Sequence, residues 1–183
     1  MERNKGKIIT VTSTKGGVGK TITTLNLAGV FCNLKKKVLV IDFDLYGGAV
    51  STYLNSKNDK TLFNLITDLS NNKYQTIDDY IYKHNEYISI LSAPKDPRFA
   101  SKMDSKYISI ILNNVVYKYD VILIDTTHIS NEINIYTLDM SDVILYIFTN
   151  DCFDLKNSKS FLTILKDAGF NNIYTVLNES IFR

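Results

Sequence analysis

A glycine-rich turn near the N-terminus constrains the fold of this chain more than any other feature. The turn covers residues 14–21, Thr-Lys-Gly-Gly-Val-Gly-Lys-Thr, and it follows the β-branched run Lys7–Thr12, which predicts a short strand. From Thr21 to about Leu34, apolar residues recur every three or four positions, which predicts a helix with one buried stripe. A strand, a glycine-rich turn and a helix in this order form a loop whose backbone N–H groups surround a phosphate.

Two side chains at the end of this turn have the chemistry that a nucleotide requires. Lys20 is expected to neutralise charge on the β- and γ-phosphates, and the Thr21 hydroxyl is expected to ligate a Mg²⁺ ion that bridges them. The turn therefore predicts a phosphate loop. A chance Lys-Thr pair after a glycine turn is the alternative, and the strand and helix on either side argue against it.

The remaining apolar runs predict further strands of a layered domain. These runs are Val38–Ile41, Tyr87–Leu91, Tyr119–Asp125, Val143–Thr149 and Ile173–Asn178. Helical patterns at Ser105–Val116 and Leu155–Ala168 separate some of them, and short helices with loops are expected between Gly47 and about Asn85. Strands that alternate with helices predict a doubly wound α/β domain, with a mostly parallel sheet and helices on both faces.

Length and composition favour one folded domain over residues 1–183. With 45% hydrophobic and 22% charged residues, the chain has enough apolar side chains to form a core, which excludes a disordered class. The longest apolar run, Val143–Phe148, is far shorter than the roughly 20 residues that cross a bilayer, and the N-terminus does not resemble a secretory signal. We therefore expect a cytoplasmic protein.

Charge and cysteine content exclude two other classes of site. A net charge of +2 with three arginines indicates no general nucleic-acid surface, so DNA binding would need a local patch. Cys32 and Cys152 are far apart and lack the spacing of metal ligands. We expect both to be buried free thiols.

Three aspartates stand at the ends of predicted buried strands. Asp42 and Asp44 follow Val38–Ile41, and Asp125 ends the run that begins at Tyr119. Ligands of doubly wound sheets bind at the carboxyl ends of the strands, so these carboxylates are expected beside the phosphate loop. Alternate strand residues point the same way, so Asp42 and Asp44 can both face the phosphates. The alternative is that each carboxylate caps the turn that follows its strand.

The turn departs from an ordinary phosphate loop in an informative way. Thr14 occupies the position of the first glycine, and a second lysine, Lys15, precedes the two glycines. Lys-Gly-Gly-Val-Gly-Lys-Thr resembles the deviant Walker A motif of the ParA/MinD family of dimeric P-loop ATPases, and the resemblance covers nearly the whole chain. It implies that Lys15 reaches across a dimer interface to the partner's nucleotide. There it would stabilise charge on the transferring phosphoryl group, as an arginine finger does.

The same resemblance implies ATP and Mg²⁺ as cofactors and gives roles to the strand-end residues. Asp44 would orient or activate the attacking water, Asp42 would help to hold the Mg²⁺ shell or the loop, and Asp125 would hold Mg²⁺ through water. Asn178, at the end of the last predicted strand, would bind the adenine edge. The implied nucleotide-binding set is Lys15, Gly16, Gly17, Val18, Gly19, Lys20, Thr21 and Asn178.

Two features differ from the family's pattern. Relatives commonly place prolines after the aspartate that matches Asp125, whereas this chain has Thr126-Thr127-His128. His128 is expected either to contact a partner or phosphate, or to be an ordinary loop histidine. Relatives also continue beyond the position of Arg183, so we expect either a minimal member of the family or a shortened domain.

The resemblance favours one function and leaves the branch open. Residues 91–97 and the helix from Leu155, followed by Gly169-Phe170, resemble the TadZ/CpaE pilus-assembly branch, whereas DNA partitioning stays open at a pI near 8.4. We expect an ATP-hydrolysing dimerisation switch that positions pilus machinery, a division site or DNA cargo, slow without a protein partner. The alternative is a non-hydrolysing nucleotide-binding scaffold. A metabolic kinase is a third class, for which the sequence offers no second-substrate site.

Overall fold

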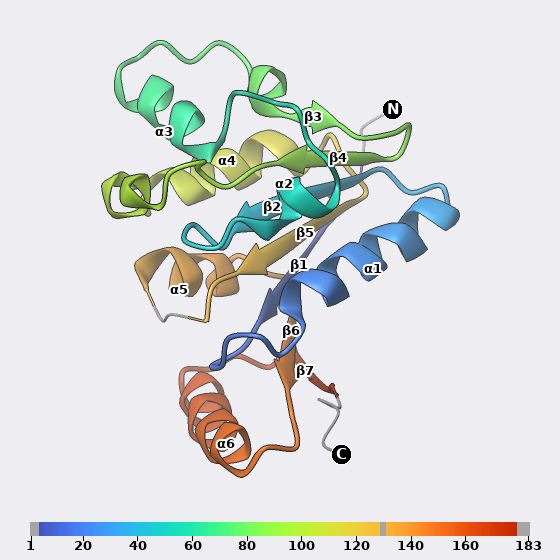
Figure 1. Cartoon of the computed structure of the whole chain (residues 1–183), viewed down its shortest axis with the longest axis vertical. Helices are drawn as coiled ribbons and strands as arrows, with labels where there is room; N and C mark the ends of the chain where they lie inside the picture. Colours follow the sequence, from blue (N-terminus) through green and yellow to red (C-terminus); the bar gives the residue numbers. More distant parts are fainter. Residues whose placement is uncertain (1–3, 129–130, 179–183) are drawn as a thin grey trace.

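A single sheet of seven strands forms the centre of the computed structural model, which describes residues 4–128 and 131–178 (Figure 1). The strands are β1 (Lys7–Thr12), β2 (Val38–Phe43), β3 (Tyr82–Lys83), β4 (Ile88–Leu91), β5 (Val121–Thr126), β6 (Val143–Phe148) and β7 (Ile173–Leu177). Their order across the sheet is β3-β4-β2-β5-β1-β6-β7, and each pair of neighbouring strands is parallel except β3–β4. The predicted doubly wound, mostly parallel fold is confirmed.

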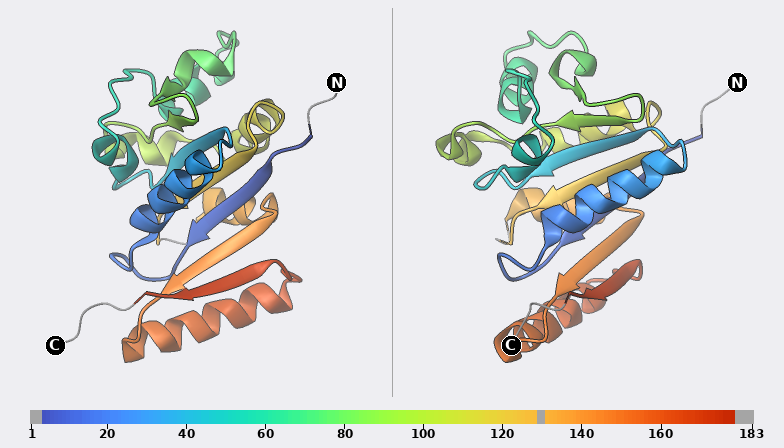
Figure 2. Two further views of the ribbon diagram at one scale, coloured as in Figure 1. Left: turned by 90° about the vertical axis from the view of Figure 1, so that its right-hand side faces the viewer. Right: turned by 45° about the vertical axis from the view of Figure 1, so that its right-hand side comes forward.

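Helices cover both faces of this sheet (Figure 2). The α-helices are α1 (Lys20–Asn33), α2 (Ala49–Tyr53), α3 (Leu62–Ser70), α4 (Tyr107–Val115), α5 (Glu132–Asp139) and α6 (Cys152–Asp167), with the 3₁₀ helices η1 (Ile77–Tyr80) and η2 (Pro97–Lys102). Helices α1 and α2 pack on one face, and α3, α4, α5 and α6 pack on the other. Within the described residues, no helix is both long enough and apolar enough to span a bilayer.

The two central strands show why the sheet holds its shape. Every residue of β2 and β5 is buried, because apolar helix faces cover both sides. Leu39 and Ile41 pack toward α4, whereas Val38 and Val40 pack toward Ala28 of α1. Each fully buried aliphatic side chain contributes roughly 2 kcal/mol of hydrophobic free energy. The carboxyl ends of these strands are therefore held firmly where the site forms.

Two elements and two cysteines depart from the sequence-based expectations. Helix α5 and the two-residue edge strand β3 were not predicted, because α5 has a poor helical stripe and β3 is too short to show a period. The prediction of buried thiols is wrong for Cys152, which is exposed at the start of α6, and Cys32 is only half-buried. Helix α6 begins earlier than Leu155, since the Asp151 carboxylate accepts bonds from its first turn.

Candidate nucleotide-binding site

The glycine-rich turn connects β1 to α1 and presents the start of that helix. Gly17 and Gly19 have φ angles of 76° and 99°, in the left-handed region that favours glycine. A Cβ on Gly19 would lie 2.6 Å from the Nδ2 atom of Asn178, so that position has no room for a side chain unless Asn178 moves. The first turn of α1 carries no acidic residue, and its positive dipole end is left for an anion.

Lys20 lies under this turn rather than in solvent. It is only 8% exposed, and its Nζ atom donates to Ser13 Oγ at 3.0 Å. Ser13 Oγ in turn donates to the Lys15 carbonyl at 2.8 Å, so the two bonds together connect Lys20, at the end of the turn, to its start. Burial lowers the pKa of Lys20, whereas the charges of Asp125 and Asp44 raise it. The two carboxylates therefore help to keep a buried cation charged beside the turn.

Thr21 and Asp125 meet although 104 positions separate them in sequence. The Thr21 hydroxyl donates to Asp125 Oδ2 at 2.5 Å, and Asp125 is fully buried at the end of β5. Its other oxygen, Oδ1, has no hydrogen-bond partner among the described residues. Burial raises the pKa of Asp125 to about 6, although the Thr21 hydrogen bond and the charge of Lys20 oppose that shift.

This pair fits a Mg²⁺ ion with a bound nucleotide. Hydroxyl and carboxylate oxygens are the ligands that Mg²⁺ prefers, and the unpartnered Oδ1 of Asp125 is a buried acceptor without a donor. The described residues hold no cluster of three or more His, Cys, Asp or Glu side chains suited to a metal. Such a cluster is not needed, because Mg²⁺ at phosphate sites takes most of its ligands from phosphates and water.

The two aspartates of the β2 end have different surroundings. Asp42 is fully buried beside Asp125 in the sheet register, and its two oxygens accept from the backbone N–H groups of Asp44 and Val50, both at 3.1 Å. Burial and the charge of Asp125 raise the pKa of Asp42 well above its usual range. Asp44 accepts from Gly47 N at 3.1 Å, within the loop that follows β2. Asp42 therefore contacts its own loop, as does Asp44.

A cavity of about 410 Å³ lies over the turn and brings separate segments together. Its wall includes the phosphate loop, Lys20 and Thr21, together with Asp44 and Tyr53 from the β2 side. His128 also lines it, with its ring 3.5 Å from where a Cβ of Gly16 would be. The sequence left the role of His128 open, and only the tertiary contact brings it to the turn.

Lys15 and Asn178 lie at the margin of this site. The Lys15 Nζ atom is 3.6 Å from Asp151 Oδ1, and both side chains are partly exposed. Asn178 follows β7 and donates from Nδ2 to the Val18 carbonyl at 2.8 Å, so it contacts the turn directly. Within the described chain, Lys15 is thus paired in its own subunit.

Sequence reasoning did not identify three side chains that support the turn. Ser13 bonds Lys20, Asp151 pairs with Lys15, and the Tyr146 hydroxyl bonds Thr14 Oγ1 at 2.8 Å. The position of Asp151 carries a local signal, since an aspartate three residues before Asp154 after a predicted strand is typical of a helix N-cap. Tyr146 has no such signal, because its hydroxyl reaches the turn only through the folded sheet.

The comparisons with known proteins agree with this geometry. A family model described as an AAA domain matches residues 6–179. An uncharacterized ATP-binding protein of Methanocaldococcus jannaschii is 28% identical over 172 residues, which cover 93% of this chain and 64% of that protein. The chain therefore spans less than two thirds of that relative's length.

Solved structures with a similar fold include proteins of the ParA and MinD type. The septum site-determining protein MinD of Pyrococcus horikoshii, complexed with Mg-ADP, is similar with a TM-score of 0.79 and 26% identity, over 94% of this chain and 70% of that chain. A ParA family ATPase from Chlorobium tepidum shares the fold, with a TM-score of 0.81 and 18% identity over 97% of this chain and 74% of that chain. With the phosphate loop formed between β1 and α1, the chain belongs to the ParA/MinD family of P-loop ATPases.

Proposed function

We propose that this chain binds ATP with Mg²⁺ and hydrolyses it as a switch that controls dimerisation. The observation that carries the proposal is the convergence of Lys20, Thr21 and Asp125 at the phosphate loop, with Asp44 lining the same cavity. These residues come from three separate loops, and structural packing alone gives no reason for a buried lysine beside two carboxylates. The Mg-ADP held by the similar MinD of Pyrococcus horikoshii supports the same cofactors.

Each residue has a role in this proposal that matches its surroundings. Thr21 and Asp125 hold Mg²⁺, which when bound neutralises charge on the phosphates. Lys20 contacts the β- and γ-phosphates, and Asp44 orients the attacking water. Asp42, whose oxygens accept two backbone bonds of its own loop, keeps Asp44 in position.

The dimer completes the proposed site. Lys15 leaves Asp151 and reaches the nucleotide of a second copy. The free-energy cost of breaking this ion pair is small, because a partly exposed ion pair contributes only about 0–1 kcal/mol to stability. Asn178, already in contact with Val18, binds the adenine edge. Residues 1–183 act as one P-loop domain in this scheme, and a protein partner stimulates slow basal turnover.

The proposed cellular role is to position an assembly. MinD of Pyrococcus horikoshii is a septum site-determining protein, and the same switch in this chain would place a division site, pilus machinery or DNA cargo. The TadZ/CpaE pilus-assembly branch stays a prediction from residues 91–97 and the helix from Leu155. Pulldown with the candidate partner of each branch, with ATP and with ADP, separates these three roles.

Light scattering combined with phosphate release tests the switch. The unmodified protein, Lys15→Ala and Asp44→Ala are compared with ATP-Mg²⁺, with ADP-Mg²⁺ and without nucleotide, and Lys156→Ala on the exposed face of α6 is the matched control. We expect a dimer only with ATP, its persistence in Asp44→Ala without turnover, and its loss in Lys15→Ala. The non-hydrolysing scaffold would be supported instead if the oligomeric state were the same with and without nucleotide and in both variants, and if no phosphate were released.

A further inference from the structure

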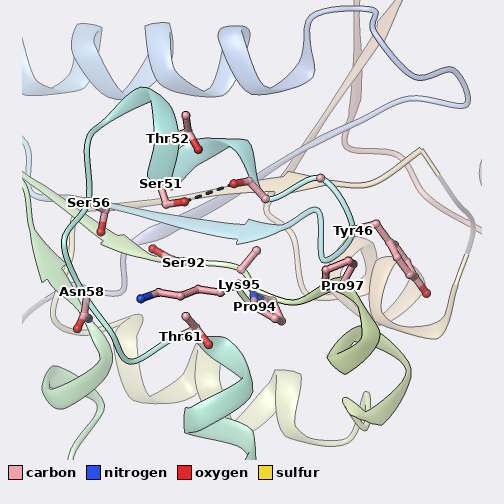
Figure 3. Close-up of a pocket in the computed structure, with 13 residues that line it drawn as sticks. Tyr46, Ser51, Thr52, Ser56, Asn58, Thr61, Ser92, Pro94, Lys95 and Pro97 are labelled. Atoms are coloured by element: carbon pink, nitrogen blue, oxygen red, sulfur yellow. Dashed lines mark hydrogen bonds between the residues drawn. The ribbon is translucent and has the colours of Figure 1, made fainter.

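A second cavity lies on the far side of β2 from the phosphate loop. The proposed function places neither Mg²⁺ nor ATP in it. Its volume is about 270 Å³, and its wall comes from the loop after β2, from α2, from the segment between α2 and α3, and from the loop between β4 and η2 (Figure 3). The Leu62 N–H donates to the Ser92 carbonyl at 2.9 Å, which joins two of these segments. The cavity is thus built by packed elements at the carboxyl edge of the sheet.

Two buried hydroxyl groups in its wall have no hydrogen-bond partner in the part of the chain that the structure describes. Ser92 is 4% exposed, and the Oγ atoms of Ser92 and Ser56 are both buried without a hydrogen bond to any described residue. In Figure 3 both side chains lie toward the end of the cavity that also holds Asn58. A buried hydroxyl without a partner is costly in a folded protein, so it points to a bound group that accepts or donates there.

The charge of the wall favours an anion. Among the described residues, the thirteen that line the cavity include Lys95 and no carboxylate. The Lys95 side chain extends toward the end where Ser56 and Ser92 lie (Figure 3). Its Nζ atom pairs at 2.6 Å with Asp59, a side chain that is 93% exposed, and exposed pairs of this kind are weak. A ligand with negative oxygens can therefore share Lys95 or displace Asp59.

The other end of the cavity is apolar. Tyr46, Pro94 and Pro97 line it, and Figure 3 shows Tyr46 and Pro97 at the end away from Ser56. An inorganic ion would fill only the polar end, whereas an organic group can contact the ring of Tyr46 and the two prolines. The division of the wall into a polar end with a cation and an apolar end identifies the chemical class of the ligand.

We propose that this cavity binds a small organic anion, a carboxylate or a phosphate monoester, with its oxygens at Ser56, Ser92 and Lys95 and its apolar part against Tyr46 and Pro97. Gly47 and Gly48 form part of the wall, and their N–H groups bond Asp44 Oδ1 and the Asp44 carbonyl. A bound ligand therefore contacts the loop that carries Asp44. The carboxylate or phosphate comes either from a free small molecule or from an acidic side chain of a protein partner.

Titrations followed by ¹⁵N NMR test this site without reference to hydrolysis. The probes are benzoate and phenyl phosphate, with neutral benzamide as the matched control, added to the unmodified chain with and without Mg-ADP. We expect both anions, and not benzamide, to shift the amide signals of Gly47, Gly48, Ser92 and Lys95 in a saturable way. Signals of Gly17 and Gly19 report the phosphate loop separately, so a failure of nucleotide binding is seen independently.

Two variants and their controls locate the binding. Ser92→Ala and Lys95→Gln are each expected to weaken binding by about fivefold or more, since each removes a donor to the anion. Ser160→Ala and Lys156→Gln, exposed on α6, are expected to leave it unchanged. Lys95 is exposed, so its variant keeps the fold even if Ser92→Ala does not.

The source of the anion is found with a blocked glutamyl-phenylalanine dipeptide and its glutaminyl counterpart. Saturation by the glutamyl peptide at lower concentration than benzoate indicates a partner's acidic side chain, and the reverse order indicates a free metabolite. Either order supports the site. The proposal is overturned if no probe gives saturable shifts in the millimolar range, or if the shifts persist in both Ser92→Ala and Lys95→Gln.

Discussion

At the scale of single residues, the site depends on carboxylates held where water does not reach them. Asp125 is fully buried, with one oxygen bonded to Thr21 and the other without a described partner. Asp42 is equally buried, yet two backbone N–H groups satisfy it. The two neighbouring aspartates therefore differ in whether an oxygen is left to bind a metal. Asp125 has one oxygen without a described partner, so it is the better candidate for a metal ligand.

The raised pKa of Asp125 predicts how stability changes with pH in the absence of nucleotide and Mg²⁺. The native state holds this proton up to a pKa of about 6, whereas the unfolded chain releases it near the ordinary value of 3.8. The contribution of Asp125 to the free energy of unfolding is therefore largest below pH 3.8, and it falls as pH rises to about 6, by on the order of 3 kcal/mol in total. Burial of Asp42 acts with the same sign.

Urea unfolding of the unmodified protein and of Asp125→Asn, between pH 4.5 and 7, measures this effect. Because asparagine does not titrate, the variant is expected to gain stability relative to the unmodified protein as pH rises. The exposed Asp167→Asn serves as the control and is expected to show no comparable trend. A difference between Asp125→Asn and the unmodified protein that stays constant across this range would falsify the assignment.

At the scale of elements, the helices beside the site are stabilised by their ends and by their packing. The N-cap residue of helix α1 is Gly19, which has a left-handed φ, and the interior of the helix contains Gly29. The N-cap residue of helix α6 is Asp151, whose Oδ1 accepts from the N–H groups of Phe153 and Asp154 at 3.1 and 3.0 Å. The N-terminus of α1 thus has a left-handed glycine and no side-chain cap, whereas that of α6 has a side-chain cap.

Replacing Gly29 by alanine is expected to stabilise the protein. A Cβ at Gly29 meets no atom within 4 Å, and the position is helical. Alanine reduces the conformational entropy of the unfolded chain, so the free energy of unfolding should rise by about 0.5–1 kcal/mol. Gly17→Ala is the informative contrast, because Gly17 also has free space but a φ of 76°, and it should destabilise. Thermal unfolding of both variants tests this prediction. Equal changes in Tm for Gly29→Ala and Gly17→Ala would contradict it.

Replacing Asp151, the cap of α6, is expected to lower the free energy of unfolding by an amount that depends on the new side chain. Asp151→Ala loses both backbone bonds and should lower the free energy of unfolding by about 1 kcal/mol. Asp151→Asn keeps a capping oxygen, loses only the charge that pairs with Lys15, and should retain most of the stability. Chemical denaturation compares them, and similar losses in the two variants would show that the ion pair, rather than the cap, matters there.

At the scale of the whole molecule, the candidate site exists only because three loops meet at one edge of the sheet. The register pairs Val11 of β1 and Asp42 of β2 with Asp125 of β5, so the three strand ends lie level. The phosphate loop follows β1, and the Asp44 loop follows β2. A ligand that bridges these loops should therefore stabilise the fold as a unit.

ATP-Mg²⁺ is expected to raise the thermal stability of the protein, and removal of the metal is expected to reverse part of that gain. A ligand at one hundred times its Kd adds about 2.7 kcal/mol to the native state. Chelation by EDTA with ATP still present should lower the Tm toward the nucleotide-free value in the unmodified protein. In Asp125→Asn, EDTA should change the Tm little, because the proposed metal ligand is gone. A chelator effect of the same size in both proteins would exclude Asp125 as that ligand.

Local pattern was enough to predict most of the strands, the phosphate loop and the three strand-end aspartates. Strand β1 has the predicted bounds Lys7–Thr12, and β6 differs from prediction by one residue at its end. These features depend on short-range chemistry: runs of β-branched side chains, a glycine turn and the helix period are visible within about ten residues. The same reasoning could not predict α5, whose first turn depends on the Asn131 cap and on burial of Ile133.

The sequence by itself determined the fold class, the phosphate loop and which carboxylates stand at the sheet edge. Only the tertiary structure decided that Asp42 bonds its own loop, that Lys15 pairs with Asp151, that Asn178 contacts Val18, and that Ser56 and Ser92 face a cavity with Lys95. The reason is physical. A strand or a turn is set by neighbours along the chain, whereas the partner of a side chain is set by which distant segments the packed sheet brings within hydrogen-bond distance.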